Sequence, residues 1–173
     1  MARLFFALWP DEAARNALAA KSTEIARRCA GRPVPAANLH LTLVFLGEVP
    51  GEAIPALRRA AQPAAGAAFE LALDRLGAFA RAGVAWAGCG RPPRELLDLQ
   101  AGLSARVREA GFTPDERAFA AHLTLARRIR EPLAPEPMEA VRWRVGSFAL
   151  VESVRGEGAY RTLADWALEG GKT

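Results

Sequence analysis

Two copies of one tetrapeptide contain the only histidines of the chain. His40-Leu41-Thr42-Leu43 returns 82 residues later as His122-Leu123-Thr124-Leu125. Because Leu occurs 21 times and Thr 6 times among 173 residues, composition alone gives a chance of roughly one in two thousand that Leu-Thr-Leu also follows the second histidine. A single histidine near a strand is most often structural. The duplication, with its threonine partner, favours a shared chemical role instead.

The spacing within each copy predicts which side chains lie together. Alternate side chains of a β-strand point to opposite faces, so His40 and Thr42 are expected on one face, about 7 Å apart, and the leucines on the other. Leu39 and Phe45 are expected to extend the apolar face of the first copy. Two such strands, related by an approximate two-fold axis, would bring two imidazoles and two hydroxyl groups to one cleft.

Two histidines and two threonines suit the hydrolysis of a phosphodiester. The reaction needs a base that deprotonates water and an acid that protonates the departing oxygen. An unperturbed imidazole, with a pKa of about 6.5, can fill either role near neutral pH. Threonine hydroxyls can donate hydrogen bonds to the non-bridging oxygens, where charge accumulates. His40 and His122 are therefore the predicted catalytic residues, and the residues themselves leave open which of the two is the acid.

Other uses of the two histidines find less support in the sequence. A zinc site needs three or four ligands, and no cluster of His, Cys and Asp with ligand spacing accompanies either histidine, so distant carboxylates would have to complete one. A serine hydrolase needs its nucleophile at a sharp turn between a strand and a helix. None of the four serines has that sequence context: Ser22, Ser104, Ser147 and Ser153. The sequence thus predicts neither a metal nor another cofactor.

Strands and helices are interleaved along the chain. Apolar runs and two-residue periodicity predict strands at residues 4–8, 39–46, 69–74, 84–87, 121–126, 141–153 and 160–168. Three-to-four-residue periodicity predicts helices at residues 11–30, 52–65 and 93–110. Asp11 is a suitable cap for the first helix, and Gly111 for the end of the third. No Gly-rich phosphate loop follows a strand, so the pattern favours an α+β fold with mixed or antiparallel sheets over a doubly wound nucleotide fold.

Size, charge and cysteine usage set broader limits. A chain of 173 residues suits one compact two-lobed domain spanning residues 1–173, and the net charge of +4 allows a phosphate-bearing partner without showing one. Cys29 and Cys89 form no metal or redox motif and are expected to be reduced thiols. The apolar run at residues 4–9 is too short for a signal peptide or a membrane span. We therefore expect a cytoplasmic monomer with no membrane contact and no obligate protein partner.

Beyond the two motifs, the chain resembles the two-histidine phosphoesterases, which carry paired H-x-T-x motifs. In particular it resembles the bacterial and archaeal RNA 2′,3′-cyclic phosphodiesterases, also called 2′–5′ RNA ligases of the LigT type. The resemblance covers nearly the whole chain. Besides the second motif, it includes Arg3–Ala7, Asn38–Val49, Leu76–Phe79, Trp86, Ala126-Arg127, Glu152-Ser153, Tyr160 and Trp166. The motifs are short, and their spacing together with these flanking residues makes the match specific.

The resemblance implies a bilobal fold in which two sheets, related by a pseudo-two-fold axis, flank a central cleft, with the helices on the outside. It also implies metal-independent hydrolysis of an RNA 2′,3′-cyclic phosphate to a 2′-phosphomonoester, and reverse 2′–5′ ligation in vitro. If the roles of the family's motif residues are carried over to this chain, His40 would protonate the departing 3′-oxygen and His122 would activate water. Thr42 and Thr124 would hold the phosphate, and Arg127 would add a cationic contact.

Two alternatives to this function stay open at the level of the sequence. The same chemistry could act on a small cyclic nucleotide, or on a cyclic phosphate of ADP-ribose, rather than on an RNA end. The protein could also be a module that binds RNA ends without turnover, in which the histidines only contact the phosphate.

Overall fold

The structure is a computed structural model that describes residues 1–62, 66–156 and 158–170. In this part of the chain the elements are β1 (Ala2–Leu8), α1 (Glu12–Arg28), β2 (Arg32–Pro33), β3 (Leu41–Val49), α2 (Ile54–Ala61), β4 (Phe69–Phe79), β5 (Val84–Gly88), α3 (Arg94–Glu109), β6 (His122–Arg127), β7 (Glu136–Val145), β8 (Ser147–Val154) and β9 (Ala159–Ala167). The predicted α+β class is confirmed.

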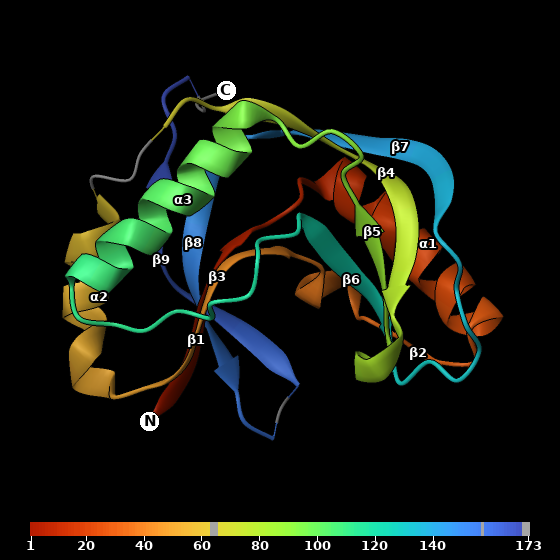
Figure 1. Ribbon diagram of the computed structural model, residues 1–173, viewed down its shortest axis with the longest axis horizontal. Coiled ribbons are helices and arrows are strands. Elements are labelled where there is room, and N and C mark those ends of the chain that lie inside the picture. The colour runs from red at the N-terminus through yellow and green to blue at the C-terminus, as the bar shows by residue number, and fades with distance from the viewer. Residues whose placement is uncertain (63–65, 157, 171–173) are drawn as a thin grey trace.

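The strands form one sheet with the order β7-β4-β5-β6-β3-β1-β8-β9, and the short strand β2 adds to β6. Every pairing between these strands is antiparallel. At the centre of the sheet, β3 and β6 are joined by a single residue pair, Leu41 with Leu123. The predicted two sheets are therefore two four-stranded halves that meet at the two motif strands (Figure 1).

The helices cover the outside of these two halves. The first, α1, packs against β6, β2 and β7, whereas α3 packs against β3 and α2 (Figure 1). Asp11 caps α1 as predicted, because its carboxylate accepts a hydrogen bond of 2.8 Å from the backbone N–H of Ala14. Gly111 ends α3 with a φ of +88°, a left-handed conformation that glycine adopts without strain. Both predicted helix signals are confirmed.

One predicted strand and one predicted helix need correction. The strand expected at 141–153 is wrong, because Gly146 separates β7 from β8 and the two lie in different halves of the sheet. Both segments are extended, and a single residue separates them, so the break is not evident from the strand pattern of the sequence. The helix expected at 52–65 begins with a 3-10 turn at Gly51–Ala53 and continues as α2, and its predicted end at 63–65 lies outside the described residues.

A buried serine ties α1 to the strand that carries the second motif. The Ser22 hydroxyl donates a hydrogen bond of 2.6 Å to the Leu125 carbonyl and accepts one of 3.0 Å from the Val34 N–H. We expect Ser22→Ala to lower the free energy of unfolding by about 1 kcal/mol, because both backbone groups lose one buried hydrogen bond but keep the bond of 2.9 Å from the Val34 N–H to the Leu125 carbonyl. Urea unfolding measures this effect. The exposed neighbour variant Thr23→Ala should stay within about 0.5 kcal/mol of the wild type, and an equal loss in both variants would contradict the account.

Candidate active site

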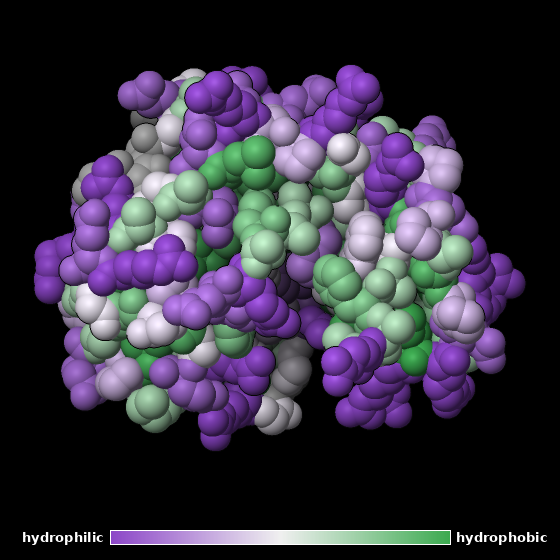
Figure 2. Space-filling view, viewed as in Figure 1, coloured by the Kyte–Doolittle hydropathy of each residue, from purple (hydrophilic) through white to green (hydrophobic). Residues whose placement is uncertain are grey.

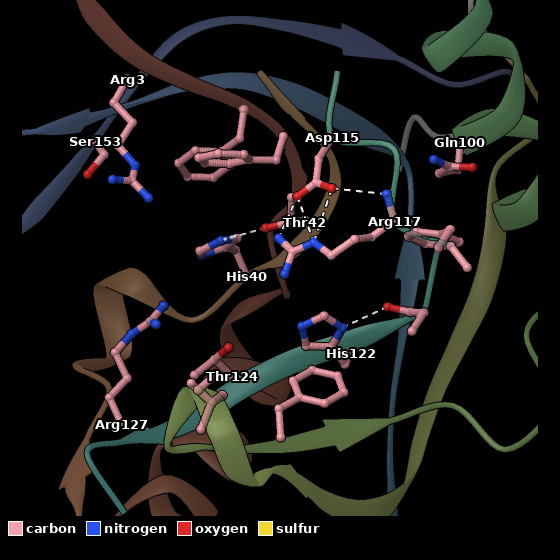
Figure 3. A pocket seen from close by; sticks show the side chains of 18 of the residues that line it. Arg3, His40, Thr42, Gln100, Asp115, Arg117, His122, Thr124, Arg127 and Ser153 are labelled. Carbon is pink, nitrogen blue, oxygen red and sulfur yellow. Dashed lines mark hydrogen bonds and ion pairs between the residues drawn. The ribbon is translucent and has the colours of Figure 1, made fainter. Parts of the chain in front are cut away.

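A pocket of about 770 Å³ lies where the two halves of the sheet meet. The predicted histidines, threonines and arginine all line it: His40, Thr42, His122, Thr124 and Arg127. Figure 3 shows these side chains converging from β3 and β6, the two central strands. Figure 2 shows the surface hollowed between the two halves, with both hydrophilic and hydrophobic residues around the hollow. The structure thus brings together every side chain that the sequence singles out.

The leucines of the motifs anchor the two strands from the opposite face. Leu41, Leu123 and Leu125 are fully buried, and Leu43 is 3% exposed. They belong to the main hydrophobic core, which also includes residues of all three helices. The predicted alternation is therefore confirmed within each tetrapeptide, and the rigid core behind the motifs fixes the backbone from which the polar side chains project.

Two β-bulges decide which residues join the pocket face after each motif. Phe6 pairs with Val44 and Ala7 with Thr42, which leaves Leu43 as an extra residue in β3. A bulge of this kind shifts the alternation by one residue. Phe45 therefore lines the pocket, and the prediction that it packs in the core beside Leu39 is wrong.

The second motif contains the same irregularity. Ala85 pairs with Ala126 and Trp86 with Thr124, so Leu125 is the extra residue in β6. Without this bulge, strict alternation would place Arg127 on the core face with the leucines. With it, Arg127 reaches the pocket on the same face as Thr124.

The His40 ring is held in one orientation and largely shielded from water. Its Nδ1 lies 2.7 Å from the Asn38 carbonyl, which fixes the proton on Nδ1, and its Nε2 lies 3.1 Å from the Thr42 hydroxyl, which can donate to it. The Phe5 ring stacks on the imidazole at 4.8 Å, and the edge of Tyr160 approaches at 5.1 Å. This burial lowers the pKa of His40 to about 4, and the positive charges of Arg127 and His122 act in the same direction.

The His122 ring repeats this arrangement on the other side. Its Nδ1 lies 2.7 Å from the Ala120 carbonyl, again two residues earlier in the chain, so Nε2 is the nitrogen free to act in the pocket. Phe79 approaches the ring at 5.0 Å in an edge-on geometry. Burial lowers the pKa of His122 below its usual value, and the nearby guanidinium groups of Arg117 and Arg127 lower it further. Both imidazoles are therefore neutral in the free protein near pH 7.

Two glycines make room for the tryptophan that supports His122. Trp86 meets the His122 ring at 6.4 Å between centroids. Its indole lies over Gly77, its cross-strand partner, and over Gly88 in its own strand. A Cβ atom at Gly77 would overlap the indole, and one at Gly88 would lie 2.7 Å from it. The glycines therefore allow the indole to lie flat on the sheet against the imidazole.

Several further pocket residues escape prediction from the sequence. Arg3, Arg81, Arg117 and Asp115 all line the cavity. The guanidinium of Arg117 binds the Asp115 carboxylate, with 2.9 Å between Nε and Oδ2 (Figure 3). Arg3 stands two residues before Phe5 in a strand, so alternation could have placed the two on one face. The other three lie outside the strands and helices that face the pocket, where no periodic signal exists.

Neither a cluster of metal ligands nor a membrane-spanning helix occurs in the described part of the chain. Within residues 1–62, 66–156 and 158–170, no three His, Cys, Asp or Glu side chains are grouped so that they could hold a metal ion. Among the helices described there, none combines the length and the apolar character that crossing a bilayer requires.

Comparison with known proteins places the chain in a family. The chain is 38% identical over 170 residues to the RNA 2′,3′-cyclic phosphodiesterase of Escherichia coli K12, with 96% of each chain covered. It is 34% identical to the enzyme of the same name from Thermus thermophilus, covering 97% of this chain and 91% of that one. The crystal structure of E. coli LigT complexed with 3′-AMP superposes with a TM-score of 0.88 at 36% identity, over 96% of this chain and 98% of that one. The family model described as the 2′-5′ RNA ligase superfamily matches residues 9–157, and the chain belongs to that superfamily.

Proposed function

We propose that this protein hydrolyses the 2′,3′-cyclic phosphodiester at an RNA end to a 2′-phosphomonoester, with His40 and His122 as general acid and general base. The observation that carries the proposal is the pair of matching imidazole and hydroxyl groups that face one pocket from two central strands. The curated relatives that share about a third of its residues over nearly their whole length are named RNA 2′,3′-cyclic phosphodiesterase, which supports the choice of substrate.

The reaction begins with water at the phosphorus atom. Neutral His122 accepts a proton from the attacking water through Nε2, and the new P–O bond forms as the bond from phosphorus to the 3′-oxygen breaks. Protonated His40 gives its Nε2 proton to that departing oxygen. The phosphate then remains on the 2′-oxygen, His40 is neutral and His122 is protonated, and exchange of protons with solvent restores the starting state.

The threonines and the arginine stabilise the charge that develops on the phosphoryl oxygens. In the free protein, the Thr42 hydroxyl can donate to Nε2 of neutral His40, 3.1 Å away. Once His40 carries a proton on Nε2, it can no longer accept a hydrogen bond from Thr42, so the hydroxyl proton becomes available to a phosphate oxygen while the Nε2 proton faces the departing oxygen. Thr124 supplies the matching hydroxyl, and Arg127 supplies a cation. Protonation of the acid thus completes the anion site.

Ligation follows from the same arrangement if an RNA 5′-hydroxyl replaces water. His122 would deprotonate that hydroxyl, and loss of the 3′-oxygen would leave a 2′–5′ phosphodiester. Product analysis tests the whole scheme. A digested oligonucleotide with a 2′,3′-cyclic end should carry its phosphate on the 2′-oxygen, whereas a 3′-phosphate would contradict the assignment of the leaving oxygen.

Removal of the Arg127 guanidinium should weaken catalysis without affecting the fold. We expect Arg127→Ala to lower kcat/KM on an RNA cyclic phosphate by about 10–100-fold, the usual effect of losing a charged hydrogen bond. Arg127→Lys should recover part of the loss, because it keeps the charge but not the paired donors. Arg130→Ala removes the same charge from an exposed residue three positions later. Equal activities of Arg127→Ala and Arg130→Ala would contradict a phosphate contact by Arg127.

A further inference from the structure

One end of the pocket contains a guanidinium and a hydroxyl to which the proposed reaction gives no role. Arg3 in β1 is paired with Ser153 in β8, and Ser153 is paired with Tyr160 in β9. Direct partners in antiparallel strands point to the same face. All three residues line the pocket, and Figure 3 shows Arg3 beside Ser153 with His40 below them. We call Arg3 and Ser153 the Arg3 subsite.

The Arg3 guanidinium is held in position, and although its charge acts on the Glu48 carboxylate, it forms no ion pair in the described part of the chain. Its Cζ lies 5.1 Å from the centroid of the Phe45 ring, a cation–π contact that orients it. The facing residue in β3, Glu48, instead accepts a hydrogen bond of 2.8 Å from Arg155. Arg3 is exposed, and it therefore presents an oriented positive charge to the pocket.

The charge of the pocket exceeds what one cyclic phosphate requires. Among the described residues that line it, four are arginines and Asp115 is the only carboxylate. Asp115 pairs with Arg117. Arg127 lowers the pKa of both histidines and therefore acts at the proposed reaction. Arg3 and Arg81 remain, whereas a nucleoside 2′,3′-cyclic phosphate has a single negative charge. Such an excess suits a ligand with more than one phosphate.

An apolar surface separates Arg3 from His40. Phe5 stacks on His40, and Arg3 precedes Phe5 by two residues in β1, about 7 Å away. The surface between them is apolar, since Phe5 and Tyr160 belong to a small cluster with Ala149. A strand that ends in a cyclic phosphate extends only through the 5′-oxygen of its last nucleoside. The next phosphate is therefore one nucleotide from the reacting phosphorus.

We propose that Arg3 and Ser153 bind the phosphodiester on the 5′ side of the terminal nucleoside, so that the protein selects polynucleotide ends over free cyclic nucleotides. The guanidinium and the Ser153 hydroxyl donate to the two non-bridging oxygens of that phosphodiester. Phe45 keeps the guanidinium in place, and the apolar surface between Arg3 and His40 accommodates the terminal nucleoside. This inference rests on the proposed function, because it assumes that the reacting phosphate lies between His40 and His122.

A pair of substrates that differ by one nucleotide tests the Arg3 subsite. One is a nucleoside 2′,3′-cyclic phosphate, and the other is the dinucleotide with the same terminal nucleoside and cyclic phosphate. The readout is the ratio of kcat/KM for the dinucleotide to kcat/KM for the mononucleotide. We expect Arg3→Gln to lower this ratio about tenfold, and Ser153→Ala to lower it by a smaller factor. The logarithm of kcat/KM for the dinucleotide should also depend less steeply on the logarithm of salt concentration, by about 0.7 in slope.

Arg94→Gln is the matched control, because Arg94 lies on α3 with its side chain 90% exposed and outside the pocket. The ratio should not change in this variant. A ratio that Arg3→Gln and Ser153→Ala leave unchanged overturns the proposal, even if both substrates react more slowly, since a folding defect affects them alike. A wild type without preference for the dinucleotide also overturns it.

The proposed function and the Arg3 subsite can fail separately. If the wild type turns over neither substrate, the proposed function is wrong. The affinities for the two 2′-phosphate products then decide on the subsite. Weaker binding of the dinucleotide product relative to the mononucleotide product in Arg3→Gln supports the subsite, and an unchanged ratio of affinities rejects it.

Discussion

Replacement of either His40 or His122 by Gln is expected to lower kcat on an RNA 2′,3′-cyclic phosphate by about 10²–10⁴-fold, the usual contribution of one acid or base. Gln fills a similar volume and can still form hydrogen bonds, but it cannot exchange a proton near pH 7. Binding of the 2′-phosphate product should therefore change much less than kcat. Rapid-quench or steady-state rates, together with calorimetric titration of the product, measure the two effects.

The two histidines should also act as a unit. If water is activated on one side while the leaving oxygen is protonated on the other, the double variant His40→Gln/His122→Gln should be nearly as slow as the slower single variant, rather than slower by the product of both effects. Urea unfolding of all three variants excludes a general loss of structure. A single variant that keeps more than about a tenth of the wild-type kcat would reject its histidine as acid or base. If the wild type binds RNA ends but shows no turnover, the protein is a binding module.

The second large effect concerns pH. Burial lowers the pKa of His40 to about 4 and lowers that of His122 below 6.5. The profile of kcat/KM reports the free protein, where one group must be protonated and the other neutral. Both apparent pKa values, which belong to the coupled pair, should then lie below 6.5. We expect the optimum of kcat/KM below pH 6.5 and a fall of about tenfold per pH unit above it.

The profile of kcat should lie at higher pH than that of kcat/KM. A bound phosphate places a negative charge beside both imidazoles, and an opposite charge raises the pKa of a histidine. Arg127→Gln provides a directed test, because the Arg127 charge lowers the pKa of both histidines. This variant should move the optimum of kcat/KM to higher pH, whereas Arg130→Gln should not. An optimum of kcat/KM above pH 7.5 in the wild type would contradict desolvated histidines.

The local pattern of the sequence was sufficient to predict the central residues of the site. The repeated tetrapeptide, its buried leucines and its paired imidazole and hydroxyl groups depend only on residue types and on the two-residue period of a strand, both of which are visible in the sequence. The capped ends at Asp11 and Gly111 are local for the same reason. The α+β class and the two central motif strands follow from these elements together.

Contacts between distant segments determined the other residues of the pocket and the pKa values of the histidines. The bulges at Leu43 and Leu125 bring Phe45 and Arg127 into the pocket, and a bulge exists only in relation to the neighbouring strand. Arg3 and Ser153 are 150 positions apart in the chain and meet through the pairing of β1 with β8. The lowered pKa values of the histidines likewise require the aromatic rings that shield them from water. The sequence by itself therefore determined the chemical groups of this protein and the strands that carry them. Only the tertiary structure decided which arginines line the pocket and how far the pKa values of the histidines are lowered, because pairing register and burial are properties of the folded chain.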